Sequence, residues 1–483
     1  MELPESFILN NTRYSRESLL RFAAEKINAA GPAGTQEALG TDGSQAAEGS
    51  QETKEAQGAQ GLQKSQKPQE SQGTQEKPTP TPAWEIELFR FIIDFFNDEK
   101  TLLQQTSGTT GEPKTITLNR DAMHVSAKRT LDHFGLQPGD TALLCLPVQY
   151  IAGKMMVVRA LVGGLNLVTI EPSGNPGHAL LQQKMQVDFA AMVPLQVYEL
   201  LNTPQAFSRI DTLIIGGGEI DPIVRKKIQK LDGIKVYETF AMSETYTHFA
   251  TRWLNESASE NSSSEMKRSG GDTSMSEEKK TGMDDKVHEQ KQSLKYVEVS
   301  DKQRTGNDVS IPPGKSKGVP REHSFQVMDG VIAELDERGC LVVDIPGVTD
   351  GPVVSNDLAE LTGPRSFRWL GRLDNVIKTG GIKVIPETIE GVVKELTGRE
   401  AVVLPVPDRR LGQKLVLVLE GTGKETASSG SSELPNRDHI AEALKSKLAA
   451  HEIPKEIRFL PEFPRNKSLK IDRKEIQRRV DMG

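Results

Sequence analysis

Short apolar runs alternate with segments of helical spacing between residues 141 and 245, and this alternation constrains the fold more than any other feature. The runs at 141–147, 188–193, 211–215 and 234–241 are typical of buried strands. A helical pattern follows each of the first three runs. Strands that alternate with helices in this way predict a doubly wound α/β architecture.

Two polar segments interrupt the folded pattern. Residues 28–82 and 255–320 are rich in Gln, Glu, Ser, Gly and Lys, and they hold too few apolar side chains to offset the entropy cost of ordering. Residues 325–346 alternate apolar and polar side chains between glycine turns, which predicts a β-meander. We therefore predict a large N-terminal domain of α/β layers with a β-meander over residues 1–370, which contains both disordered inserts. A small, mobile α+β C-terminal domain is predicted over residues 371–483.

Composition excludes several classes of function. The 483-residue chain carries a net charge of −7, which gives no electrostatic basis for binding nucleic acid. Cys145 and Cys340 lie far apart without metal-ligand spacing and suit a reducing compartment. The N-terminus lacks a signal-peptide pattern, and no apolar run reaches the roughly 18 residues of a membrane span. We expect a cytoplasmic protein with no membrane span, and the sequence leaves open whether it forms a homo-oligomer.

Residues 106–114, TSGTTGEPK, form a polar, glycine-rich segment between two strand-like stretches. Glycine allows close backbone approach, and the run of N–H and hydroxyl donors can wrap an anion. Lys114 adds a positive charge, so phosphate fits this loop. An ordinary turn of Gly, Ser and Thr is the alternative. The segment does not match the Walker pattern, because the Gly-Lys-Ser/Thr triplet is missing and the next element is a strand.

Two further segments carry groups that suit a nucleotide. The three glycines of LIIGGGE, residues 213–219, follow an apolar strand and leave bare backbone against which a flat ring could lie. In YETFAMSET, residues 237–245, Phe240 can stack on a base and Ser243 can bond a phosphate. Glu244 can hold Mg²⁺, which prefers oxygen ligands and keeps substrate phosphates in its shell. A crowded strand–helix turn and a solvated loop carboxylate are the alternatives.

Polar groups near the predicted domain boundary and the C-terminus complete the set. Asp357 is placed to accept hydrogen bonds from sugar hydroxyls, and Arg372 and Asp374 stand where the two predicted domains meet. Lys470 lies in the basic segment PRNKSLKIDR. A surface ion pair and a solvated basic tail are the alternatives for these groups.

The order, types and separations of these segments resemble those of the adenylate-forming enzymes, a family of acyl-CoA synthetases, adenylation domains and luciferases. TSGTTGEPK is similar to the family's phosphate loop, GGGE to its adenine-side turn and FAMSE to its aromatic–Gly–Met–Thr–Glu motif. SND is similar to the ribose motif, GRLDNVIKTGG to the hinge and PRNKSLK to the catalytic-lysine motif. The likeness covers roughly residues 84–254 and 322–475, and Ala241, Ser243 and Leu469 depart from it.

The resemblance implies that ATP, Mg²⁺ and coenzyme A serve to convert a small-molecule carboxylic acid to an acyl-adenylate and then to a thioester. It implies β,γ-phosphate binding by Thr106, Ser107, Gly108, Thr109, Thr110, Gly111 and Lys114, and an adenine frame of Gly217, Gly218, Glu219 and Phe240. It further implies phosphate contact by Ser243, Mg²⁺ binding by Glu244, ribose binding by Asp357 beside Arg372, a hinge at Asp374 and a coenzyme A side at Gly380 and Gly381. Lys470 would be catalytic, together with Lys114 and Glu244.

The acid is suggested by a narrower resemblance. The short ordered region before residue 106 and the segment LPVQYIAGKMMVVRAL, residues 146–161, are similar to the o-succinylbenzoate–CoA ligases of menaquinone synthesis. In those ligases the equivalent segment lines the acyl pocket, which would place Tyr150 there. Lys154 and Arg159 interrupt an apolar helix, so we expect one of them to pair with a second carboxylate of the acid. The alternative is that both extend to solvent.

Three other interpretations remain open on sequence alone. The protein could be another acyl- or aryl-CoA ligase, or a free-standing adenylation domain that loads a carrier protein. A nucleotide-binding protein without catalysis is the non-enzyme alternative, and the departures at Ala241, Ser243 and Leu469 motivate it. The intact Glu244 and Lys470 argue against that alternative.

Overall fold

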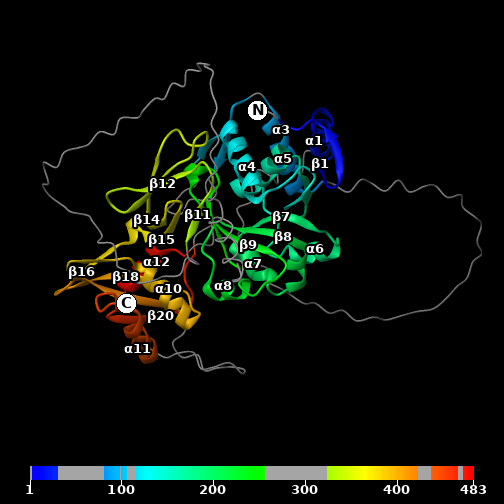
Figure 1. Ribbon diagram of the computed structural model, residues 1–483. Helices are drawn as coiled ribbons and strands as arrows, with labels where there is room; N and C mark the ends of the chain where they lie inside the picture. Colours follow the sequence, from blue (N-terminus) through cyan, green and yellow to red (C-terminus); the bar gives the residue numbers. More distant parts are fainter. Residues whose placement is uncertain are drawn as a thin grey trace, which may run out of the picture. The chain divides into compact units, whose positions relative to one another are not determined.

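The computed structural model describes residues 3–30, 81–97, 99–105, 115–255, 324–421, 437–465 and 471–482. Two compact units make up the chain, Met1–Pro176 and Gly177–Gly483. Both combine helices and strands, as predicted for an α/β protein (Figure 1). Within the described ranges, no helix combines the length and the apolar character that a bilayer crossing requires.

In the first unit, strands follow the order β5-β6-β1-β2, and a separate hairpin is formed by β3 and β4. β5, β6 and β1 run parallel, and β2 returns antiparallel to β1. The elements are β1 (Ser6–Leu9), β2 (Thr12–Ser15), α1 (Arg16–Ala29), α3 (Ala83–Phe96), β3 (Thr101–Gln105), β4 (Thr115–Asn119), α4 (Arg120–Phe134), β5 (Thr141–Leu144), α5 (Ile151–Gly163) and β6 (Asn166–Thr169).

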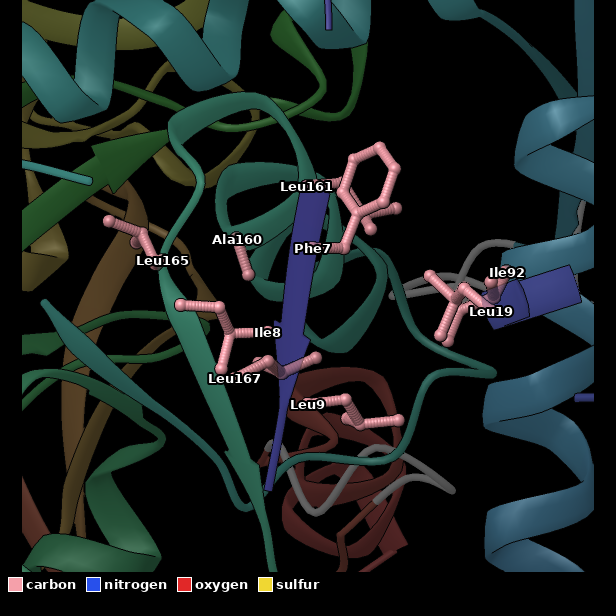
Figure 2. Close-up of a pocket in the computed structure, with 9 residues that line it drawn as sticks. All are labelled: Phe7, Ile8, Leu9, Leu19, Ile92, Ala160, Leu161, Leu165 and Leu167. Carbon is pink, nitrogen blue, oxygen red and sulfur yellow. The ribbon is translucent and has the colours of Figure 1, made fainter. Parts of the chain in front are cut away.

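Apolar side chains from β1, α1, α3, α5 and β6 meet in the core of this unit, and Figure 2 shows them around a small internal cavity. The Phe22 and Phe89 rings join α1 to α3 edge to face, with centroids 5.5 Å apart. The cavity holds about 10 Å³, which is close to the minimum for one water molecule, and its lining is apolar. It is therefore a packing gap and no ligand site.

In the second unit, strands follow the order β12-β13-β14-β15-β11-β10-β9-β8-β7 (Figure 1). β7, β8 and β9 are parallel, and the pairs from β9 to β12 are antiparallel. The elements are α6 (Gly177–Gln182), β7 (Val187–Met192), α7 (Pro194–Leu200), η1 (Pro204–Arg209), β8 (Ile210–Ile215), α8 (Pro222–Ile228), β9 (Lys235–Ala241), η2 (Ser243–Thr245), β10 (His248–Trp253), β11 (Phe325–Val327), β12 (Ile332–Leu335), β13 (Cys340–Asp344), β14 (Val353–Gly363) and β15 (Ser366–Arg372).

The β-meander predicted at 325–346 is present in part: β12 and β13 form a meander that continues into β14 and β15, whereas the first predicted strand, β11, lies elsewhere. β11 pairs with β10 and β15, so it sits between the meander and the parallel strands. Alternation of apolar residues predicts that a segment forms a strand, but it does not predict which strand it pairs with. The sequence therefore did not give the place of β11 in the sheet.

The C-terminal part of the second unit has its own buried clusters. Ile389, Val393, Leu415 and Leu417 belong to one cluster, and Phe463 belongs to another. The elements are η4 (Leu373–Asn375), β16 (Ile377–Thr379), β17 (Ile382–Val384), α10 (Pro386–Thr397), β18 (Ala401–Asp408), β19 (Gly412–Glu420), α11 (Arg437–Lys447), β20 (Glu456–Leu460) and α12 (Arg473–Met482). The predicted domain boundary after residue 370 falls inside this unit and stays a prediction.

The predicted limits of the two inserts need small corrections. Helix α1 extends to Ala29, and the Ala30 N–H donates to the carbonyl oxygens of Ile27 and Asn28 at its end. Asn255 also belongs to the folded part, since its side chain donates to the carbonyl oxygens of Leu231 and Ile234. Residues 31–80 and 256–323 lie outside the described residues.

Candidate active site

The predicted phosphate segment connects the two strands of a hairpin. β3 and β4 are antiparallel, and Gln105 pairs with Thr115, so the hairpin holds the two ends of the segment together. Residues 106–114, with Lys114 and every other predicted phosphate ligand of the segment, lie outside the described residues. Their roles stay predictions.

The glycine turn after β8 is tightly packed against β9. The Thr239 hydroxyl donates to the Ile215 carbonyl at 3.0 Å, and a Cβ at Gly216 would lie 2.5 Å from that hydroxyl oxygen. Gly217 has φ +84°, which favours glycine. Glu219 is exposed at the end of the turn. The sequence pointed to Gly217 and Gly218, whereas the closest packing is at Gly216.

Phe240 is half-buried near the end of β9 in a cluster of four aromatic rings. Its centroid lies 5.7, 5.2 and 5.3 Å from those of Phe249, Phe325 and Phe367, all near edge to face. Such pairs hold a ring in a defined orientation. The cluster thus fixes the ring that we predict to stack on a nucleobase.

Glu244 lies in the short helix η2, directly after β9, and its side chain is exposed. The side chain of Ser243 lies outside the described part. An exposed carboxylate on a tight turn fits Mg²⁺, which commonly takes one or two protein carboxylates together with waters and substrate phosphates. The donor type therefore suits the predicted role of Glu244.

Asp357 and Arg372 lie opposite each other on β14 and β15. The Oδ1 atom of Asp357 accepts a hydrogen bond from Trp369 Nε1 at 3.1 Å and lies 3.4 Å from a terminal nitrogen of Arg372. Asp357 is buried, and no donor of the described residues reaches its Oδ2 atom. An oriented carboxylate with one oxygen left to accept fits a ligand that offers hydroxyl groups.

The hinge candidate Asp374 joins this cluster from η4. Its Oδ2 atom lies 3.0 Å from Arg372, and its Oδ1 atom accepts a hydrogen bond from Asn356 Nδ2 at 3.1 Å. Partial burial opposes the charge of Arg372, but the carboxylates of Asp374 and Asp357 outweigh it and raise the pKa of Arg372. The structure therefore brings Asp357, Arg372 and Asp374 together.

Gly380 and Gly381 form the turn of the β16–β17 hairpin. Their φ angles of +56° and +85° lie in the region that glycine tolerates best. Antiparallel pairing of Thr379 with Ile382 closes the turn. Their role on a coenzyme A side is untested.

A buried charge network that the sequence did not indicate is centred on Glu238, two residues before Phe240 on β9. The Glu238 carboxylate on β9 accepts hydrogen bonds from Arg225 on α8, at 2.9 Å, and from Arg252 on β10. Burial disfavours the charge of Glu238, but the two arginines lower its pKa. The available signal was an acidic residue in the middle of a run that is typical of a strand.

Lys470 lies outside the described residues, but its flanks are firmly attached. Arg465 and Ile471 form an isolated antiparallel bridge around residues 466–470. Arg473, the first residue of α12, donates two hydrogen bonds to Glu390 on α10, at 2.9 and 2.6 Å. Glu390 also accepts a hydrogen bond from the Val403 N–H at 2.6 Å. This pair links the segment that carries Lys470 to the C-terminal core.

The Glu390 carboxyl gives a pH-dependent prediction. Burial raises its pKa from 4.5 to about 7, against the opposing effects of Arg473 and the Val403 N–H. Between these values only the folded state binds the proton, so the free energy of unfolding should fall as pH rises, by at most about 1.4 kcal/mol per pH unit. This contribution is complete below pH 4.5 and lost above pH 7.

The Glu390→Gln variant has no carboxyl group at this position, so its free energy of unfolding should lack this dependence on pH. Denaturant unfolding of both proteins from pH 4 to 8 gives the difference, in which all other titrating groups cancel. Parallel curves would contradict the prediction and show that Arg473 keeps Glu390 ionised throughout.

Of the three candidates for the acid pocket, Lys154 is the best placed. It borders a pocket of about 610 Å³ in the first unit, between α3, β3 and the start of α5. Its Nζ donates to Gln104 Oε1 at 2.6 Å and lies 5.7 Å from the Phe91 ring centroid. Tyr150 is 51% exposed at the N-terminal end of α5, while Arg159 is only 2% exposed and borders neither this pocket nor the core cavity.

Residues 31–271 match the model of the AMP-binding enzyme family. The chain is similar to the 2-succinylbenzoate–CoA ligases of Bacillus cytotoxicus (24% identity over 394 residues) and Lactococcus lactis (21% over 385 residues). Each alignment covers 80% of this chain and 72% of the relative.

The fold is similar to that of o-succinylbenzoate CoA synthetase (MenE) from Bacillus subtilis, solved in complex with the acyl-adenylate intermediate OSB-AMP. The TM-score is 0.54 at 19% identity, over 78% of this chain and 68% of that one. At this identity the likeness shows the fold alone. The match to the family model identifies the chain: it belongs to the AMP-binding enzyme family.

Proposed function

We propose that this protein is an AMP-forming acid–thiol ligase that joins 2-succinylbenzoate to coenzyme A. The observation that carries the proposal is the similarity to 2-succinylbenzoate–CoA ligases over 80% of the chain. The cluster of Asp357, Arg372 and Asp374 supports it, because these groups lie together as a nucleotide site of this family requires.

Adenylate formation brings two anions together, so positive charge has to offset their repulsion. A carboxylate oxygen of the acid attacks the α-phosphorus of ATP, and the bond to pyrophosphate breaks. Lys470 would hold the α-phosphate and the acid, Lys114 would hold the departing phosphates, and Asp357 would accept hydrogen bonds from the ribose. Mg²⁺, held by Glu244, would supply further charge neutralisation when bound.

The thioester then forms at the same acyl carbon. The thiolate of coenzyme A attacks it, and the bond to AMP breaks. By the family resemblance, the C-terminal domain rotates between the two steps, which withdraws Lys470 and turns Gly380 and Gly381 toward coenzyme A. The single hairpin that carries both glycines makes them a compact surface for this purpose.

Lys154 is our candidate for the second carboxylate of the acid. Phe91, Leu102, Leu103 and Val148 supply apolar surface to its pocket, as an aromatic acid requires. The acid would have to displace Gln104 from the lysine amine. Asp94 and Glu87 also border the pocket, and burial raises the pKa of both carboxyls.

The proposed reaction is tested by measuring pyrophosphate release from ATP and Mg²⁺ with 2-succinylbenzoate, followed by mass detection of the thioester. Both products are expected. Pyrophosphate without a thioester would point to a carrier-protein acceptor, and no acid-dependent pyrophosphate would refute this acid.

Lys154→Met should raise the KM for 2-succinylbenzoate by about tenfold to hundredfold, because a hydrogen bond to a charged group contributes about 1.5–3 kcal/mol. The KM for ATP should change little. Arg159→Met is the matched control on the same helix and should leave the KM for the acid unchanged. With benzoate, which lacks the second carboxylate, the effect of Lys154→Met should vanish. Equal effects on the acid and on ATP would refute the assignment.

A further inference from the structure

The connection between β9 and β10 contains two residues that we predict to bind the nucleotide and its Mg²⁺, Ser243 and Glu244. Ala241 and His248 pair in the antiparallel register, so residues 242–247 form the connection. Glu244 is exposed there, whereas its neighbour Thr245 is only 1% exposed. The chain therefore presents the carboxylate and buries the adjacent side chain.

The Thr245 hydroxyl forms hydrogen bonds with backbone groups on both sides of Glu244 in this connection. Its Oγ1 accepts a hydrogen bond from the Met242 N–H at 3.1 Å, before Glu244 in the chain. Its single proton is shared between the carbonyl oxygens of Thr247, at 2.8 Å, and Met242, at 2.9 Å. One hydroxyl thus ties the residue before Ser243 to the chain beyond Glu244.

The backbone after Thr245 is strained. Tyr246 has φ +60°, in the left-handed region that residues with a side chain seldom adopt. The Thr247 N–H donates to the Thr245 carbonyl at 2.6 Å and spans Tyr246. Such strain persists where surrounding contacts over-determine a conformation, and it concentrates at functional sites. The hydrogen bonds of Thr245 are contacts of this kind, and they hold the strained backbone at Tyr246.

We propose that Thr245 is a positioning residue whose buried hydroxyl holds the Glu244 carboxylate in place for a magnesium-bound triphosphate. The identity of that ligand rests on the proposed function, whereas the positioning role of the Thr245 hydroxyl rests on the hydrogen bonds described above. Loss of a group that orients a metal ligand reduces metal affinity by about tenfold to hundredfold. Thr245→Val keeps the side-chain shape and removes the hydroxyl, whereas Thr245→Ser keeps the hydroxyl.

Calorimetric titration of ATP at a series of Mg²⁺ concentrations, and in EDTA, tests the proposal by binding alone. Thr245→Val should raise the Mg²⁺ concentration for half-maximal ATP binding about tenfold or more, and Thr245→Ser should restore it. Binding in EDTA should be the same for all variants. Thr130→Val is the matched control, because among the described residues this buried threonine on α4 donates to the Ser126 carbonyl alone, at 3.2 Å.

An unchanged Mg²⁺ dependence in Thr245→Val would overturn the proposal, as would the same loss in Thr130→Val, which would indicate general destabilisation. Equal losses in Thr245→Ser and Thr245→Val would also overturn it, because the hydroxyl would then be irrelevant. A protein that binds ATP with Mg²⁺ but forms no thioester would refute the proposed reaction, and the comparison of the two Thr245 variants would still decide the role of Thr245.

Discussion

Lys470→Ala is expected to lower the rate of acid-dependent pyrophosphate release by about 10²- to 10³-fold, as the loss of one stabilising group at a developing charge commonly does. The affinity for ATP should change far less, because Lys470 is expected to act mainly as the acid attacks. Fixed-time assays of pyrophosphate release measure the rate, and an equilibrium titration of ATP measures the affinity.

Lys467→Ala is the matched control, since it removes the same charge from the same short segment. It should retain most of the activity. Thioester formation from a supplied acyl-adenylate should stay close to that of the wild type in both variants, because Lys470 is withdrawn before this step in the proposed cycle. Equal losses in the two variants would contradict the assignment and point to the net charge of the segment.

At pH 8, where the Glu390 carboxyl is ionised in the wild type, Arg473→Met is expected to destabilise the C-terminal part of the second unit by about 3–5 kcal/mol, because it leaves the buried Glu390 carboxylate without its charged partner. Of the donors in the described part of the chain, only the Val403 N–H would still reach that carboxylate. Hydrogen exchange of the β18 and β19 amides, followed by mass spectrometry, reports the stability of this region directly.

Two comparisons isolate the buried pair. Arg478→Met removes an exposed arginine from the same helix, whose partner Glu475 lies 3.0 Å away, and should change stability by less than about 1 kcal/mol. The double variant Glu390→Leu with Arg473→Met removes both charges and should recover most of the loss. If the double variant is as unstable as Arg473→Met, packing around α12 rather than the unpaired charge would be the cause.

The sequence predicted those elements that carry a complete local signal. Helix α4 begins after Asn119, a residue type that favours helix N-caps, and the Asn119 side chain accepts hydrogen bonds from the N–H groups of Asp121 and Ala122. It ends at Gly135, which has φ +68° and is the residue type that favours this end of a helix. The strands after residue 140 were equally clear, because each is a short apolar run of its own.

Features that depend on distant partners could not be predicted in this way. Glu390 and Arg473 are 83 residues apart, and no local pattern indicates that they pair. The burial of Arg159 likewise depends on packing around α5, and periodicity left its exposure to solvent open. For the candidate site, the residue types and the position of Arg372 beside Asp357 could be predicted from the sequence, whereas the stabilising contacts of Thr245 and Glu238 are visible only in the folded structure.

One contact of α10 carries a thermodynamic consequence. Lys394 on α10 lies 2.7 Å from Glu400 and 3.7 Å from Glu219, which ends the predicted adenine-side turn. A cation shared in this way couples two equilibria: the binding of ligand at that turn and the departure of α10 from it. Thermodynamic linkage requires this coupling to be reciprocal. If a bound nucleotide favours the present position of α10 by a given factor, then α10 in that position raises the affinity for the nucleotide by the same factor.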